Sequence, residues 1–138
     1  FIEDYAFLIS ALNDLSDKTM NFKYKNLARE LCIEAIKKFY LNDKNIFQKN
    51  SKNSNDIFFK PIDISDNTAP NGNAIMLINF TKLGMIEEAQ KLSESLNGYL
   101  NVYKSHMMTS LRAIDYFRNI KEGKNCNEKG CNLDAKKN

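Results

Sequence analysis

The hydrophobic positions of this chain repeat with helical rather than strand spacing over most of its length. From Glu3 to Leu15, apolar residues cover most of a helical circumference, and from Tyr24 to Tyr40 they form one stripe with the charged residues off it. The first pattern predicts a helix with neighbours on several sides. The second predicts a surface helix that packs by one face.

Three more helices are predicted in the second half of the chain. The stretch from Asn73 to Leu83 is apolar all round and stops at Gly84, a residue type that tolerates the left-handed conformation of a helix C-terminus. The next helix begins at once and carries a one-sided stripe, and we expect Gly98 to weaken or end it. The last helix, from Lys104 to Phe117, is again rich in apolar residues.

Helices that alternate between all-round and one-sided burial predict two concentric layers joined as antiparallel hairpins. A simple antiparallel bundle would make every helix one-sided. We therefore predict an all-α fold that is a partial α/α toroid. If the inner helices run in the same sense, their N-termini gather at one end, which would hold three polar segments: Glu3 to Tyr5, Asp66 to Asn73, and Ser105 with His106.

A long polar connection, residues 41 to 69, separates the second and third helices. It contains two short apolar clusters, Ile46-Phe47 and Ile57-Phe58-Phe59, which predict a small β-hairpin. Connections of this length inside a compact domain are usually functional or disordered. The connection leads into a turn-forming loop, Asp66 to Asn73, in which Asn71 or Asn73 is placed to cap the buried helix that follows.

Composition and charge narrow the class of protein. The chain has 138 residues, of which 43% are hydrophobic and 27% are charged, as in one ordinary globular domain. Its net charge of +3 is too small for a nucleic-acid-binding footprint. It contains no apolar run of about 20 residues and no signal segment, so we expect a soluble, cytoplasmic protein without membrane contact. Phe1 leads into a helical pattern without a cap, which suggests a piece of a longer protein.

Three motifs, in order and spacing, resemble one known family. They are Glu3-Asp4-Tyr5-Ala6-Phe7 (the family's LEDYAF type), the aromatic cluster around Ile57-Phe58-Phe59, and Asp66-x3-Pro70-x-Gly72-Asn73 (its DGAxPSGNS type). The chain resembles the C-terminal helical region of thioredoxin-domain-containing proteins related to the spermatogenesis-associated thioredoxin-like protein. The likeness extends to about Phe117. Beyond Arg118 the chain is polar and aperiodic, so we expect a domain over residues 1–118 and a disordered tail over 119–138.

The resemblance implies an N-terminal thioredoxin-like domain followed by a six-hairpin, glycosidase-like α/α toroid, of which this chain would supply the last hairpins. The resemblance suggests carbohydrate chemistry only through the analogy of fold. The first functional hypothesis is a toroid cavity that binds or processes a small polar, carbohydrate-like molecule. The alternative is a non-catalytic interaction platform attached to the thioredoxin-like domain of the same full-length chain.

Two carboxylates are the candidates for acid/base work, because glycosidic chemistry needs two carboxyl groups that face one cavity. They are Asp4 and Asp66, and the alternative is that both cap helices or hold the loop, the commonest role of Asp at a helix start. Glu3 is a further candidate for ligand binding, at the rim of the predicted cavity. Tyr5 is placed either to stack on a sugar ring or to fill the core.

The remaining candidates belong to the loop and to the last helix. Asn71 and Asn73 are candidates for binding ligand hydroxyls, whereas Gly72 more simply serves the turn. His106, the single histidine, precedes the last helix, where it is either a general acid or base or a structural residue. The sequence offers no set of metal ligands, and no cofactor is expected.

The chain contains three cysteines. Cys32 lies on the apolar stripe of the second helix and is expected to be an inert core thiol. Cys126 and Cys131 lie in the tail with a separation that matches neither a redox Cys-x-x-Cys motif nor half of a zinc site. A local disulfide and two free thiols both remain open for this pair.

Overall fold

The computed structural model describes residues 1–53, 61–62, 64–123, 126–127 and 130–131. Over these residues the chain is mostly helical, which confirms the all-α class. The elements are α1 (Ile2–Thr19), α2 (Phe22–Phe39), β1 (Tyr40–Leu41), β2 (Ile46–Phe47), α3 (Gly72–Leu83), α4 (Ile86–Tyr103), the 3-10 helix η1 (Lys104–His106), α5 (Met108–Lys121), β3 (Cys126–Asn127) and β4 (Gly130–Cys131).

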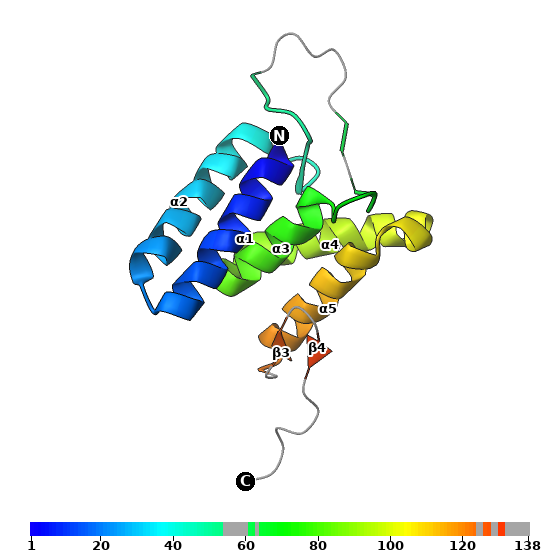
Figure 1. The fold of residues 1–138 in the computed structure, drawn as a ribbon. Coiled ribbons are helices and arrows are strands. Elements are labelled where there is room, and N and C mark those ends of the chain that lie inside the picture. Colours follow the sequence, from blue (N-terminus) through cyan, green and yellow to red (C-terminus); the bar gives the residue numbers. More distant parts are fainter. Residues whose placement is uncertain (54–60, 63, 124–125, 128–129, 132–138) are drawn as a thin grey trace.

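Helix α3 is the centre of the arrangement. It packs against α1 on one side and α5 on the other, and α4 also packs against it. Helix α2 packs mainly against α1, and α4 bridges α3 and α5. Figure 1 shows that α1, α3 and α5 run in the same sense, each beginning at its upper end. The prediction that alternate helices share one direction is confirmed for these three.

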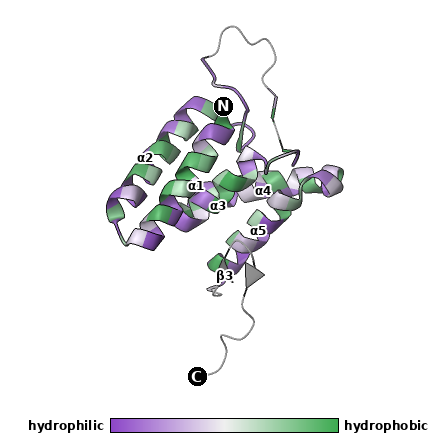
Figure 2. Ribbon diagram, in the orientation of Figure 1, coloured by the Kyte–Doolittle hydropathy of each residue, from purple (hydrophilic) through white to green (hydrophobic). Residues whose placement is uncertain are grey.

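The helices begin and end at residues whose chemistry satisfies free backbone groups. The Asn21 side chain accepts a hydrogen bond from the Lys23 amide (3.1 Å) and caps α2, and Asn71 does the same for α3. Gly84, with φ +70°, ends α3 in the left-handed conformation, as its sequence position predicts. Figure 2 shows hydrophobic and hydrophilic residues interleaved along α1 and α2, the pattern of helices with one buried face.

The expected all-round burial holds for α3 but was wrong for α1 and α5. Ten of the twelve α3 residues are buried. On α1, by contrast, Phe7, Leu8 and Leu15 are 39%, 51% and 41% exposed, and on α5 Met108 and Leu111 are about half exposed. The reason is the number of neighbours. Within the described residues, α3 packs closely against three helices and is also touched by α2, whereas α1 and α5 each pack against two.

Helix α4 also runs further than its sequence predicts, because Gly98 does not end it. A glycine inside a helix costs about 1 kcal/mol relative to alanine. That cost is offset on both sides of the position, where Leu96 is fully buried and both Tyr99 and Leu100 pack against the core. The next helix begins later than predicted, at Met108, because residues 104–106 form a 3-10 turn.

The structure describes a small hairpin in which Ile46–Phe47 is one of the two strands. Strand β2 pairs antiparallel with β1, with Tyr40 opposite Phe47, and the two rings meet edge to face at 4.9 Å. The proposed partner cluster, Ile57-Phe58-Phe59, lies outside the described residues. Asn73 of α3 secures the hairpin from the other side. Its Oδ1 accepts from the Phe47 amide (2.9 Å) and its Nδ2 donates to the Phe47 carbonyl (3.0 Å).

At the C-terminal end, α5 continues to Lys121, beyond the domain boundary expected at residue 118. The backbones of β3 and β4 then pair antiparallel, with Cys126 opposite Cys131. The side chains of these two cysteines, and residues 132–138, lie outside what the structure describes. Among the described helices, none combines the length and the apolar character required to cross a bilayer.

Cys32 is fully buried, as predicted from its place on the α2 stripe. Burial raises the pKa of the Cys32 thiol to about 12, against a smaller lowering by the Arg29 guanidinium. The thiol therefore stays protonated throughout the neutral range. Because the folded-state pKa is the higher one, any contribution of this group to stability is present below about pH 9 and is lost as the pH rises toward 12.

We expect iodoacetamide at pH 8 to leave Cys32 unmodified in the folded protein, because the reactive thiolate is neither formed nor accessible. Peptide mass spectrometry after native labelling, compared with labelling in guanidinium chloride, measures this. Equal modification of Cys32 under both conditions would contradict its burial.

We expect Asn73→Ala to lower the free energy of unfolding by about 2–4 kcal/mol, because it leaves both the N–H and the C=O of Phe47 buried without partners. Urea unfolding followed by circular dichroism measures the change. Asn26→Ala is the matched control, since Asn26 is exposed on α2 and should stay within about 0.5 kcal/mol of wild type. A loss of unfolding free energy for Asn73→Ala no larger than that for this control would refute the role of Asn73 in holding Phe47.

Candidate functional site

The predicted site lies where the N-terminal ends of α1, α3 and α5 meet. At the first junction, Gly72 opens α3 directly against α1. A Cβ at this position would lie 3.1 Å from Ile2 Cγ2 and 3.4 Å from both the Cγ and the amide nitrogen of Glu3. Gly72 therefore serves the close approach of two helices, in addition to the turn that its sequence context predicts.

Asp66 makes the second junction, between α3 and α5. Its Oδ1 accepts from the Asn71 amide (3.1 Å) and from Asn71 Nδ2 (2.8 Å), and its Oδ2 accepts from the Thr109 amide (2.7 Å). The Asp66 amide in turn donates to the His106 carbonyl (2.7 Å). Both carboxylate oxygens are thus engaged by backbone and side-chain donors at two helix starts, where negative charge is also favoured by the helix dipoles.

Asn71 extends this network into the protein interior. It is 2% exposed. Its Oδ1 accepts from the Ala74 amide (2.9 Å) and caps α3, while its Nδ2 also donates to Ser110 Oγ (3.2 Å) on α5. Asn73, fully buried, is the clamp on β2 described above. Both asparagine amides are therefore used by the fold itself.

Glu3 is the carboxylate at this end with unused capacity. Its Oε1 lies 3.4 Å from Lys49 Nζ, whereas its Oε2 is buried and has no hydrogen-bond partner in the structure. The side chain as a whole is 23% exposed. Asp4, the neighbouring candidate, is 76% exposed and contacts the amino group of Phe1 rather than Glu3 or Asp66.

Tyr5 faces α2 instead of the shared end of the three helices. Its hydroxyl donates to Glu34 Oε1 (2.7 Å) and accepts from Lys38 Nζ (2.8 Å), and its ring meets Phe39 edge to face at 5.4 Å. Hydrogen bonds from Lys38 and Tyr5 lower the pKa of the Glu34 carboxyl. Of the two roles open to Tyr5 from sequence, packing is the one that these contacts favour.

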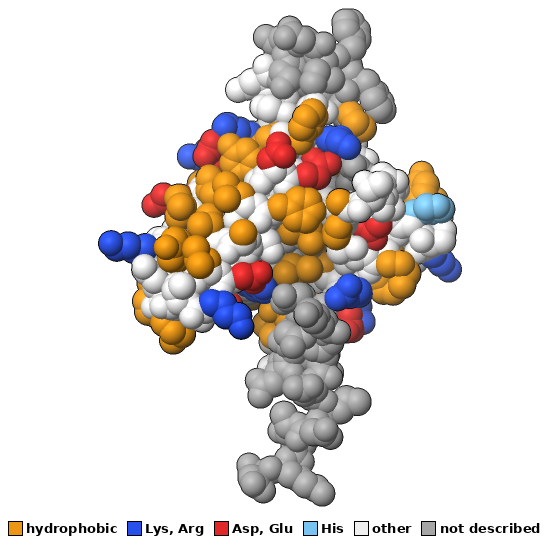
Figure 3. Space-filling model, viewed as in Figure 1, with side chains coloured by type: hydrophobic (Ala, Val, Ile, Leu, Met, Phe, Trp, Pro, Cys, Tyr) orange, Lys and Arg blue, Asp and Glu red, His pale blue; other side chains and the backbone are white. Residues whose placement is uncertain are grey.

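His106 lies in the 3-10 turn before α5 and is exposed. Its Nδ1 is 2.9 Å from Ser105 Oγ, and Figure 3 shows its side chain at the edge of the molecule. The histidine is tied to the site through its backbone, because its carbonyl accepts from the Asp66 amide. Within the described ranges, no group of three or more His, Cys, Asp or Glu side chains is arranged to hold a metal ion.

This arrangement of side chains is suited to binding a ligand. It is not suited to acid/base chemistry between two carboxylates. The structure brings together Glu3, Asp66, Asn71 and Gly72, but the oxygens of Asp66 are occupied. The oxygen of Glu3 that lacks a partner is suited to accept a hydrogen bond from a ligand hydroxyl, with the Lys49 ammonium beside it as a donor.

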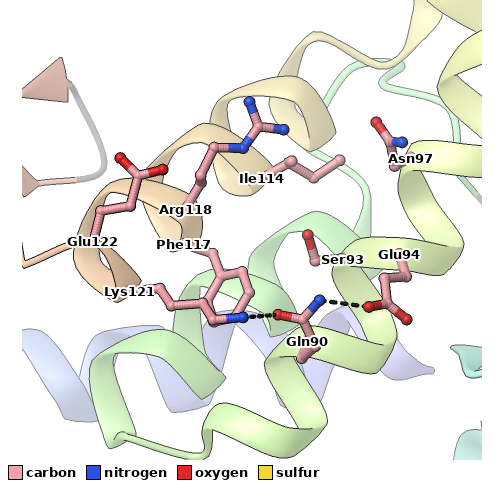
Figure 4. A pocket seen from close by; sticks show the side chains of 9 residues that line it. All are labelled: Gln90, Ser93, Glu94, Asn97, Ile114, Phe117, Arg118, Lys121 and Glu122. Atoms are coloured by element: carbon pink, nitrogen blue, oxygen red, sulfur yellow. Dashed lines mark hydrogen bonds between the residues drawn. The ribbon is translucent and has the colours of Figure 1, made fainter.

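A concave region that the sequence did not predict lies between α4 and α5 (Figure 4). On α4 it is lined by four polar residues spaced i, i+3, i+4 and i+7: Gln90, Ser93, Glu94 and Asn97. Such a polar stripe beside the apolar one is a signal that could have been found, because this spacing places side chains on one helix face. The apolar stripe of α4, taken alone, does not indicate this polar stripe.

We expect Asp66→Ala to lower the free energy of unfolding by about 2–4 kcal/mol, because three donors at the starts of α3 and α5 lose a charged acceptor. Amide hydrogen exchange at Thr109 should accelerate, which distinguishes local release of α5 from global weakening. Asp17→Ala on the exposed side of α1 is the control. Unchanged hydrogen exchange at the Thr109 amide would contradict the hydrogen-bonded link that Asp66 makes between α3 and α5.

No protein-family model, no curated protein and no solved structure matches this chain. The shared end of α1, α3 and α5 is defined by three contacts of its own: the close approach at Gly72, the Asp66 bridge and the partly used carboxylate of Glu3.

Proposed function

We propose that this chain forms part of an α/α toroid that binds a small hydroxylated, carbohydrate-like ligand where the N-terminal ends of α1, α3 and α5 meet. The observation that carries the proposal is the buried Oε2 of Glu3, which has no hydrogen-bond partner among the described residues although Lys49 lies beside the same carboxylate. A buried carboxylate oxygen without a donor is costly, and a ligand hydroxyl would supply that donor.

The helix arrangement supports the toroid part of the proposal. In such a fold the inner helices run in one direction side by side, and the outer helices return behind them. Helices α1, α3 and α5 share a direction, and α3 contacts both of the others (Figure 1). Helices α2 and α4 are the returning members of the hairpins. The partly exposed apolar residues of α1 and α5 are then the surface that further inner helices would cover.

Binding, rather than hydrolysis, is the role that the contacts favour for this end. Hydrolysis of a glycosidic bond needs two carboxyl groups free to act on one cavity. Asp66 is committed to Asn71 and Thr109, so it acts as a positioning residue that holds the starts of α3 and α5. Glu3 is the residue that we expect to touch the ligand.

Titration with a panel of neutral mono- and disaccharides tests the proposal. We expect at least one sugar to bind, and Glu3→Gln to weaken that binding about fivefold or more, because the amide replaces one charged acceptor. Asp4→Asn is the matched control, since Asp4 is exposed and makes none of these contacts. Absence of binding across the panel, or equal affinity of Glu3→Gln and wild type, would refute it.

A second function, an interaction platform for a thioredoxin-like domain, is favoured by one observation. Apolar side chains gather over α1 on the face shown in Figure 3. The apolar α1 residues Phe7, Leu8 and Leu15 are partly exposed. Grouped exposed apolar residues mark protein contacts more often than isolated ones do. Under this reading a thioredoxin-like domain supplied in trans binds the chain, Leu8→Lys abolishes the binding, and Glu3→Gln leaves it intact. Loss with Glu3→Gln alone would favour the ligand site.

A further inference from the structure

The concave region between α4 and α5 is a pocket with a volume of about 510 Å³. This is the size range of small-molecule sites. It lies in the C-terminal half of α5, apart from the helix starts discussed above. Its apolar part comes from Ile114 and Phe117, which are 4% and 3% exposed and also belong to the core. A rigid apolar base with polar walls is the usual construction of a binding site for a small polar molecule.

One side of the pocket is closed by a chain of hydrogen bonds. Lys121 Nζ donates to Gln90 Oε1 (2.9 Å), and Gln90 Nε2 donates to Glu94 Oε1. Figure 4 shows these two bonds in line along the wall. The positive charge of Lys121 and the negative charge of Glu94 are thus linked through one amide, so this side of the pocket carries one charge of each sign.

Arg118 is different, because its guanidinium makes no hydrogen bond or ion pair with any residue that the structure describes. It is exposed on α5 and lines the pocket. Guanidinium groups bind carboxylates through two parallel hydrogen bonds, a geometry that a lysine ammonium does not offer. The pocket therefore holds one charged donor whose natural partner is an anion.

Ser93 adds a neutral polar group to the pocket. Its hydroxyl has no hydrogen-bond partner among the described residues, although the residue as a whole is only 8% exposed. Figure 4 shows this hydroxyl pointing from α4 into the space below Arg118, with the Asn97 amide on the same side. A serine hydroxyl both donates and accepts, so it suits a hydroxyl group of a ligand.

We propose that this pocket binds a small monocarboxylate whose body carries hydroxyl groups. Arg118 would hold the carboxylate, Ser93 and Asn97 would hydrogen-bond the hydroxyls, and the carbon chain would lie on Phe117 and Ile114. A single negative charge suits the site, because its lining holds two cationic side chains, Arg118 and Lys121, and two carboxylates, Glu94 and Glu122, and a more highly charged anion would meet the repulsion of both carboxylates. Inorganic phosphate, with a higher charge and no carbon chain, fits it less well.

Isothermal titration of the purified chain with sodium gluconate tests the proposal. Sorbitol is the matched probe, since it replaces the carboxylate of gluconate by a hydroxymethyl group and keeps the hydroxylated chain. We expect gluconate to bind about tenfold or more tightly than sorbitol, because the charged hydrogen bonds to Arg118 are lost with the latter. Absence of gluconate binding, equal binding of the two, or tighter binding of inorganic phosphate would overturn the proposal.

Two variants locate the binding. Arg118→Gln should weaken gluconate about tenfold or more and leave sorbitol unchanged, whereas Ser93→Ala should weaken both ligands about threefold or more. Lys91→Gln is the control for general charge, since Lys91 is an exposed residue of α4 that does not line the pocket. Equal loss in Arg118→Gln and Lys91→Gln would assign binding to diffuse electrostatics and overturn the site. Glu3→Gln should bind gluconate normally, which separates this site from the shared helix end.

Discussion

Three helices of this chain begin at nearly the same place, and their free backbone N–H groups must find acceptors there. The first turn of every α-helix carries amide groups without partners inside the helix. The Asp66 carboxylate serves Asn71 and Thr109 at once, and so joins the starts of α3 and α5. Direct contact at Gly72 joins α3 to α1. The relative placement of α1, α3 and α5 depends on this shared use of a few polar groups.

Burial of α3 provides most of the remaining cohesion. A helix that is apolar on every side has to be surrounded, and α1, α4 and α5 surround it. Its few polar side chains are used to connect elements. Asn79 Nδ2 donates to the Ala6 carbonyl of α1 (2.8 Å), and the Asn13 side chain approaches Asn79 Oδ1 at 3.4 Å. Apolar burial thus gathers the helices, and buried amides fix how they fit together.

The helix positions could be predicted from sequence because periodicity and capping residues are local signals. Gly84 was correctly identified as the end signal of α3, and of the two candidate caps, Asn71 and Asn73, it is Asn71 that starts the helix. The number of neighbours of each helix could not be predicted, since an apolar residue such as Leu8 has the same sequence signature whether or not another element covers it. Nor does any local pattern show that Ile46–Phe47 pairs with Tyr40–Leu41.

The candidate site was predictable only in outline. Sequence order placed Glu3, Asp66 and Asn71 at one end, and the contacts agree. It could not separate the carboxylate whose oxygens are all used, Asp66, from the one that retains an open oxygen, Glu3, because that distinction depends on Thr109, 43 positions away along the chain. The α4–α5 pocket likewise depends on how two helix faces are rotated toward each other.

The bond between Asn73 and the backbone of Phe47 has a consequence for strand alignment. Strands of two residues have little of their own to prevent them from sliding by one position, a shift that would turn each side chain to the opposite face. The asparagine amide recognises both backbone groups of a single residue, as a neighbouring strand would. A helix therefore dictates the register of this hairpin, so that slippage would require α3 itself to move.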